Sequence, residues 1–188
     1  KDAEDQGNPL PFRELSNTEV VKEMGAGINL GNTMDGHSSF TPSETAWQAA
    51  KTTKEYIKTL HDAGYNTVRV PVTWGTMIDT QNGYTINEKW MTRVQDIVDY
   101  CTEQDMYCII NIHHDGAEQT GWLRVAADDI DAVYEQFEGV WRTIAERFKD
   151  YDEHLIFESM NEVTDGDKGT QNEVQVLNNL NQIFVNVV

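Results

Sequence analysis

The chain has 188 residues, enough for one ordinary domain with a full hydrophobic core. Its 32 acidic and 14 basic residues give a formal net charge of -18, and this charge repels nucleic-acid phosphates and anionic lipid surfaces alike. We therefore expect no nucleic-acid partner, and the absence of a long apolar run argues against a membrane span.

The chain begins with a polar segment, a short helix and a first strand. Residues 1–15 are polar and interrupted by Pro and Gly, which is typical of a lead-in segment without chemistry. Cap residues at the start of 16–24 predict a short helix. Residues 25–32 predict a strand with one apolar face and one small, polar face, and Asn29 lies on the polar face.

A loop rich in Ser, Thr and Gly follows at residues 33–45, and the segment from Trp47 to His61 predicts a helix that ends at Gly64. The apolar stripe of this helix is expected at Tyr56, Ile57, Leu60 and Ala63. Further strands are predicted at 67–74, 107–114 and 155–162, each with alternating apolar and polar residues. Amphipathic helices are predicted after each of them, the first beginning after Asn87.

Strand, loop and helix thus recur four times, which predicts parallel βαβ units. The loop after each strand is longer and more polar than the loop before the next strand. Polar residues therefore gather at the carboxyl ends of the strands, where βα barrels have their active sites. Four units make half of an eightfold (β/α)8 TIM barrel, and a doubly wound α/β sheet is the alternative architecture. No Gly-x-Gly-x-x-Gly follows a strand, so a phosphate cradle is not expected.

Alternation places the polar strand residues on the inner face of such a barrel. These residues are Asn29, Arg69, Asn111, His113, Glu158 and Glu162. A buried Arg69 needs a carboxylate partner, and Glu158 is the candidate. An ion pair without a catalytic role remains an alternative for both residues.

The first residues, Lys1 to Ala3, lack the apolar core of a signal peptide, so a secreted protein with its signal removed and a cytosolic protein both fit. The two cysteines, Cys101 and Cys108, are too few for a disulfide scaffold or a zinc ribbon. Both lie in apolar patterns, and we predict that they are buried small hydrophobic residues.

Four motifs in order, over roughly residues 20–165, resemble successive strand motifs of glycoside hydrolase family 5, most closely its endoglucanase and xyloglucanase branch. They are Gly27-Ile28-Asn29-Leu30-Gly31-Asn32-Thr33, Thr67-Val68-Arg69-Val70-Pro71-Val72-Thr73-Trp74, Asn111-Ile112-His113-His114-Asp115 and Phe157-Glu158-Ser159-Met160-Asn161-Glu162. The resemblance implies a (β/α)8 fold that cleaves β-1,4-linked glucans with retention. It further implies that residues 1–188 form the N-terminal half of the catalytic barrel.

The resemblance also implies roles for individual residues. Glu162 matches the general acid/base of the family, and Asn161 matches its contact to the sugar 2-hydroxyl. Arg69 matches the arginine that orients the nucleophile, and His113 matches the histidine that lines the same subsite. His114 is a further candidate for substrate binding, with a loop histidine bonded to a neighbour as the alternative. We also expect Asn29 to line the substrate-binding face.

Glycosidic bond cleavage with retention needs a protonated acid at the leaving oxygen and a second carboxylate about 5 to 5.5 Å away as nucleophile. The family places that nucleophile on its seventh strand, so this chain would hold Glu162 without it. We expect the C-terminal half barrel to be a partner. No cofactor is expected, and the His and Asp residues lack a metal-ligand spacing, so no metal is predicted.

Sugar rings stack on indoles, and Trp47, Trp74 and Trp122 lie in or beside predicted βα loops. All three are predicted to bind substrate, although Trp47 lacks the Gly-Asn-Pro that often follows the first-loop Trp of the family. Trp90 and Trp141 fall on helical stripes and are predicted to be core residues.

The main hypothesis is therefore a secreted endo-β-1,4-glucanase half that acts on cellulose, mixed-linkage glucan or xyloglucan. One alternative is a carbohydrate-binding protein without turnover. The other is a four-unit doubly wound domain of unrelated function.

Overall fold

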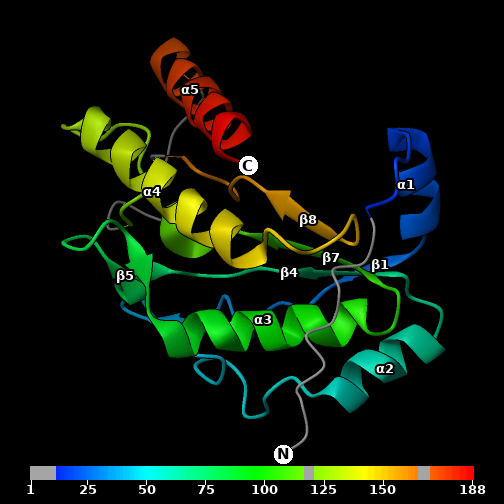
Figure 1. Cartoon of the computed structure of the whole chain (residues 1–188). Helices are drawn as coiled ribbons and strands as arrows, with labels where there is room; N and C mark the ends of the chain where they lie inside the picture. The colour runs from blue at the N-terminus through cyan, green and yellow to red at the C-terminus, as the bar shows by residue number, and fades with distance from the viewer. Residues whose placement is uncertain (1–11, 117–120, 165–169) are drawn as a thin grey trace, which may run out of the picture.

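The computed structural model describes residues 12–116, 121–164 and 170–188, and its central feature is a parallel sheet of four strands (Figure 1). The strands are β1 (Gly27–Asn29), β4 (Thr67–Val70), β7 (Tyr107–Asn111) and β8 (Leu155–Glu158). Their order in the sheet, β1-β4-β7-β8, is their order in the chain, and every pair is parallel. A doubly wound sheet reverses its strand order at a switch point, so the described strands exclude that alternative and form part of a (β/α)8 barrel.

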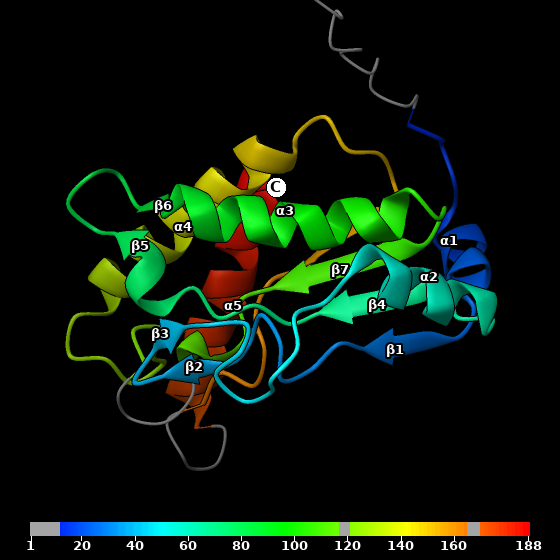
Figure 2. The same ribbon diagram turned by 90° about the horizontal axis from the view of Figure 1, so that it is seen from below.

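Helices follow the strands in the pattern expected of βα units. One helix precedes β1 and lies at the starting ends of the strands, as Figure 2 shows by the direction of the arrows. The helices are α1 (Asn17–Met24), α2 (Lys54–Asp62), α3 (Glu88–Thr102), α4 (Ile130–Phe148) and α5 (Gln171–Val187). Among the described residues, no helix combines the length and apolarity needed to cross a membrane.

The inner and outer faces of the sheet are those predicted from the alternation. Most outward-facing valines and isoleucines are buried under the helices, as are both cysteines and the predicted core residues Trp90 and Trp141, whereas Ile28 of β1 is half-buried. Fully buried outward-facing side chains are Val68, Val70, Val72, Ile110 and Ile112. On the inner face Asn29 is exposed and Arg69 is half-buried. Apolar burial therefore fixes which side of each strand carries the polar groups.

The helix predicted from Trp47 begins seven residues later than expected. The side chain of Thr53 accepts the backbone N–H of Tyr56 and caps α2, which starts at Lys54. Within α2, Ile57 and Leu60 are buried as predicted, whereas Tyr56 and Ala63 are exposed. The segment before the cap is a loop, and it keeps Trp47 outside regular secondary structure.

The strands are shorter than the predicted segments because their last residues leave the regular ladder. They remain bonded across the sheet: Leu30 N–H donates to the Arg69 carbonyl at 2.8 Å and His113 N–H to the Val72 carbonyl at 2.8 Å. The third segment was predicted to extend to His114, but β7 ends at Asn111 and the chain turns into a 3₁₀ helix, η2 (His114–Gly116). In these irregular segments the side chains no longer alternate between the two faces of the sheet.

Two hairpins occupy the loops after β1 and β4, where the sequence indicated only loops. The first pairs β2 (His37–Ser38) with β3 (Thr41–Pro42), and the second pairs β5 (Ile78–Asp79) with β6 (Thr85–Ile86). In the first hairpin the two turn residues, Ser39 and Phe40, have φ values of 49° and 59°. A two-residue turn of this handedness fits the strand twist but strains residues with side chains.

Contact with η1 (Gly75–Met77), the 3₁₀ helix after β4, holds this strained turn in place. The Thr76 N–H donates to the Phe40 carbonyl at 2.9 Å. A Cβ at Gly75 would lie 1.9 Å from the Phe40 oxygen, and Gly75 itself has φ of 36°. Only glycine permits this approach.

We predict that Gly75→Ala destabilises the fold by about 3 kcal/mol, since it adds a backbone clash to the strain of a positive φ. The matched control is Gly64→Ala, where φ is 94° and nothing lies within 4 Å of the new Cβ. The control should lose about 1 kcal/mol. Urea denaturation measures both, and equal losses would contradict the steric explanation.

Candidate active site

Arg69 lies at the centre of the polar inner face. Its Nε and Nη2 donate to the two carboxylate oxygens of Glu158, both at 2.6 Å. Its Nη1 donates to Asn29 Oδ1 at 2.8 Å, and Nη2 also donates to Asn161 Oδ1 at 2.9 Å. The predicted Arg69–Glu158 pair is confirmed, and one guanidinium joins β1, β4, β8 and the turn after β8.

The pair is ionised. Burial alone would raise the pKa of Glu158, but the hydrogen bonds and charge of Arg69 outweigh it, and the pKa is lowered. The hydrogen bond to Glu158 in turn raises the pKa of Arg69. Two-pronged binding of a carboxylate by a guanidinium also fixes both planes. This geometry holds Arg69 rigidly at the floor of the site.

Glu162 lies at the rim above this floor. The chain leaves β8 after Glu158, and the Asn161 N–H donates to the Ile112 carbonyl at 2.9 Å. The next residue, Glu162, is exposed and has φ of 46°. Such strain in a non-glycine residue is concentrated at functional sites. The turn therefore directs the Glu162 carboxylate to the open face, close enough to Arg69 that its charge contributes to the raised pKa of Arg69.

Asn111 fixes the state of His113. Its Oδ1 accepts the Val72 N–H at 3.1 Å, so its amide nitrogen faces His113 Nδ1 at 3.2 Å. His113 Nδ1 is then an acceptor, and the proton of the neutral ring is on Nε2. Burial, together with the charges of His114 and Arg69, lowers the pKa of His113 to about 4. His113 thus presents a neutral N–H donor near neutral pH.

His114 lies near the carboxylate of Asp35, with 3.6 Å between Nε2 and Oδ2. Burial opposes ionisation of Asp35, but the nearby His114 and the hydrogen bond from the Thr33 N–H lower its pKa overall. The bend into η2 keeps the His114 ring against His113, with ring centroids 4.5 Å apart. The sequence did not indicate Asp35, because it follows a short strand inside a polar loop.

Within residues 12–116, 121–164 and 170–188, Asp35, His113 and His114 are the group that could hold a metal, since one ligand atom of each lies within 4.8 Å of the others. The chemistry of His113 disfavours this. Its Nδ1 lone pair is engaged with Asn111, and its Nε2 carries the proton of the neutral ring. The cluster is therefore suited to hydrogen-bond hydroxyl groups.

Four rings pack together beside His113. We call them the ring wall; they are His37, Phe40, Trp47 and His114. The His37 ring centroid lies 5.0 Å from those of Phe40 and Trp47, and Trp47 lies 5.3 Å from His114. Trp47 is 44% exposed and offers a face to a ligand. Sequence reasoning missed His37 and Phe40, because a hairpin of two-residue strands has no detectable periodicity.

The prediction that Trp74 binds substrate is wrong. Its side chain is 0% exposed, and its indole N–H donates to the Asn111 carbonyl at 3.0 Å. The segment after β4 folds over the end of the sheet, and this places the ring in the core rather than in the groove. Trp122 is half-buried and remains a candidate for substrate binding.

Asp115 organises these loops and was not singled out from the sequence. Its carboxylate is fully buried and accepts the N–H groups of Trp74 at 3.0 Å and Gly75 at 2.6 Å, and the indole N–H of Trp122 at 2.7 Å. Burial raises the pKa of Asp115, and these donors oppose that rise. The sequence signals were its position directly after two histidines and its place at the end of the third family motif.

Sequence similarity to known proteins identifies the family of this chain. The family model described as cellulase, glycosyl hydrolase family 5, matches residues 23–188. The chain belongs to glycosyl hydrolase family 5. Endoglucanase A of Paenibacillus barcinonensis is 40% identical over 181 residues, covering 94% of this chain and 45% of that protein. Endoglucanase A of Ruminococcus albus is 38% identical, covering 94% of this chain and 49% of that protein.

Solved structures agree with this family 5 assignment. A family 5 xyloglucanase from Paenibacillus pabuli superposes with a TM-score of 0.87 at 44% identity, covering 90% of this chain and 48% of that one. A broad-specificity endoglucanase from Ruminococcus champanellensis, solved with cellotriose, also gives 0.87, at 41% identity, with 95% and 54% covered. The family 5 chain thus spans about half the length of the relatives it matches.

We predict that Arg69→Met lowers the free energy of unfolding by about 1 to 3 kcal/mol, because it leaves Glu158 without its counter-charge. The figure is below that of a fully buried pair since the two side chains are 26% and 32% exposed. Arg142→Met, which removes an exposed ion pair with Glu138 on α4, is the control and should change stability by less than about 0.5 kcal/mol. Similar losses in urea denaturation would argue against a buried role for Arg69.

We also predict a pH dependence from His113. Its folded pKa of about 4 lies below the unfolded value of about 6.5. Between these values the unfolded chain binds a proton that the folded chain does not, so stability falls as pH is lowered through this window. His113→Gln should flatten the fall between pH 6.5 and pH 4 in urea denaturation. Parallel profiles for the two proteins would refute the lowered pKa.

Proposed function

We propose that this chain is the acid/base half of a retaining endo-β-1,4-glucanase. Family membership supports hydrolysis of a glycosidic bond. The observation that carries the proposal is the position of Glu162, at the rim of the inner face and next to an Asn161 amide held by Arg69. Cellulose, mixed-linkage glucan and xyloglucan are the proposed substrates.

In this mechanism Glu162 donates a proton to the leaving oxygen and later accepts one from the attacking water. Asn161 is suited to bind the sugar 2-hydroxyl, because its Oδ1 accepts from Arg69 and its amide N–H groups point away from that bond. His113 Nε2–H is a neutral donor for a hydroxyl beside it. Arg69 would orient the nucleophilic carboxylate, whose required separation from Glu162 is about 5 to 5.5 Å.

We assign that nucleophile to a C-terminal half barrel. Within the described residues β1 pairs only with β4 and β8 only with β7, so each has an edge open to further strands. On α5, Val174 and Val185 are exposed, which supports packing against a following unit. Below, the assembled enzyme means this chain together with a C-terminal half barrel of the family.

The ring wall and Trp122 are proposed to bind the glucan. Sugar rings present apolar C–H faces that pack on exposed indoles. Trp47 packs against His37, in the hairpin after β1, and His114, in the turn after β7, whereas Glu162 follows β8, so a glucan bound along the open face would contact both. The polymeric nature of such substrates supports a place of action outside the cell.

A binding role without turnover is the second candidate for the chain by itself. The ring wall, His113 and Asn161 all lie within this chain, whereas the proposed nucleophile does not. Calorimetry of the isolated chain with cello-oligosaccharides tests this candidate, and the absence of heat at millimolar ligand argues against it.

We predict that Glu162→Gln lowers hydrolysis of natural glucan by the assembled enzyme about 100- to 10,000-fold, since proton transfer to the leaving group is lost. An aryl cellobioside with a good leaving group should form the glycosyl-enzyme at a nearly normal rate, because its leaving oxygen needs no proton. Burst-phase kinetics measure this first step with the aryl substrate, and steady-state assays measure hydrolysis of the glucan.

Glu138→Gln, on the exposed face of α4, is the matched control and should keep full activity. Near-normal hydrolysis of glucan by Glu162→Gln would exclude its role as acid/base. Hydrolysis of glucan by the isolated chain would exclude the division of the carboxylate pair between two halves.

A further inference from the structure

Both ends of the loop that carries Trp47 are hydrogen-bonded to helix α3. It extends from Ser43 to Thr53, between β3 and α2, and contains no helix or strand. Near its start, the Glu44 carboxylate is 4% exposed and accepts the N–H of Thr52, near its end, at 2.7 Å. One carboxylate therefore joins the two ends of the loop.

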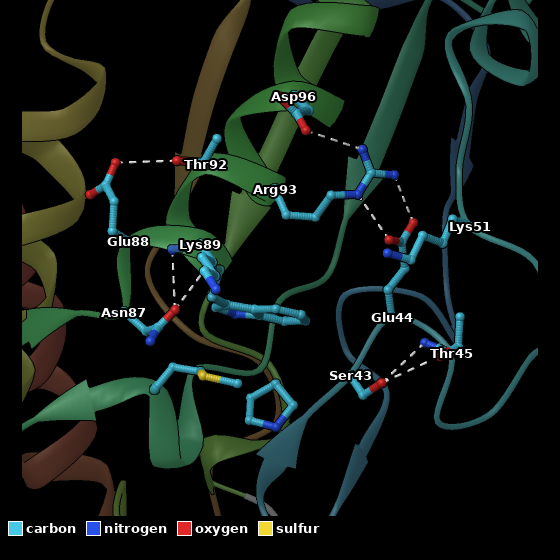
Figure 3. A pocket seen from close by; sticks show the side chains of 13 residues that line it. Ser43, Glu44, Thr45, Lys51, Asn87, Glu88, Lys89, Thr92, Arg93 and Asp96 are labelled. Atoms are coloured by element: carbon cyan, nitrogen blue, oxygen red, sulfur yellow. Dashed lines mark hydrogen bonds and ion pairs between the residues drawn. The ribbon is translucent and has the colours of Figure 1, made fainter.

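Arg93 of α3 binds the same two residues. Its Nε and Nη2 donate to the two Glu44 oxygens, both at 2.8 Å, and Nη2 also donates to the Thr52 carbonyl at 2.6 Å. Figure 3 shows Arg93 extending from α3 toward Glu44, with Asp96 as a further partner. This bidentate pair fixes the orientation of the two side chains as well as their separation.

The ion pair lies between α3 and the loop of residues 43–53. Burial alone would raise the pKa of Glu44, but Arg93 and the Thr52 N–H lower it overall. The Arg93 side chain is 18% exposed. Buried ion pairs contribute little net stability compared with apolar residues of similar size, and some are retained because they specify one geometry.

The residue that this geometry affects is Trp47, which lies between the two fastened ends. Its ring contacts His37 and His114 from one side and is 44% exposed on the other. No regular secondary structure holds residues 45–51. The position of the indole therefore depends on where α3 holds Glu44 and Thr52.

We propose that the Glu44–Arg93 ion pair is a positioning device that presents Trp47 to the glucan and so sets affinity for the chain segment remote from the cleaved bond. This inference rests on the proposed function. Glu44 and Arg93 do not touch the inner face; they act through Trp47. Their loss should weaken binding while the chemistry at Glu162 continues.

The test uses the double variant Glu44→Met/Arg93→Met in the assembled enzyme. Apolar replacement of both partners avoids a lone buried charge, and it releases the Thr52 N–H and carbonyl from their bonds to the pair. We expect KM for a long cello-oligosaccharide to rise about 5- to 20-fold, with kcat changed by less than about twofold, as for a lost binding contact that does not act on the reacting bond.

A second background separates positioning from general weakening of the structure. In Trp47→Ala, KM should already be raised, and adding the double variant should raise it no further, because residues that act through one side chain are not additive. Arg147→Met is the control, since it removes an ion pair with Glu88 that joins α3 to α4 without touching the loop. In Arg147→Met, KM should equal that of the parent enzyme.

An unchanged KM in the double variant, or an equal rise with and without Trp47, overturns the positioning role while the proposed function stands. A parent enzyme that cleaves no β-glucan overturns the proposed function and this inference with it. Hydrogen exchange of the amide of Ala46, which precedes Trp47 and donates to the Ser43 carbonyl, adds a readout without activity: faster exchange in the double variant and normal exchange in Arg147→Met support the positioning role. Normal exchange in both overturns it.

Discussion

A guanidinium on the inner face of a parallel sheet is the constraint on which the rest of this site depends. The charge of Arg69 lies in the middle of β4, where it is costly to keep from water without partners. Glu158 supplies the opposite charge, and Asn29 and Asn161 supply oxygens. These partners come from β1, which pairs with β4, and from β8 and its following turn, which lie beyond β7 in the sheet, so one side chain ties the positions of these segments together. Glu162 directly follows Asn161, so the position of Asn161 determines where Glu162 lies at the rim.

Buried carboxylates fasten the loops around this centre. Asp115 accepts N–H groups from the loops after β4 and β7, Asp35 accepts the Thr33 N–H, and Glu44 accepts the Thr52 N–H. Carboxylates have several acceptor sites each, which suits them to loops whose N–H groups lack a ladder partner. The excess of acidic residues is therefore more than a solvated surface, because a few of them hold the walls of the groove.

Family membership and the four-strand sheet together explain why this chain carries only part of the residues expected of a complete active site. A (β/α)8 barrel gathers its active site from the ends of all its strands. This chain supplies an acid/base candidate, an arginine network and a ring wall, and it spans about half the length of the relatives it matches. The second carboxylate of a retaining hydrolase would come from the other strands. Among the described strands, β1 and β8 each have an unpaired edge, and the other strands would continue the sheet there.

The sequence by itself determined the order of the βα units, the faces of the strands and the Arg69–Glu158 pair. Alternation with period two and the cost of an unpaired charge are local rules that survive folding. Tertiary structure decided what happens beyond the strand ends. There Trp74 turned into the core, His114 bent toward Asp35, and a two-residue hairpin placed His37 beside Trp47. Short irregular segments take their shape from long-range contacts, which no periodicity in the sequence encodes.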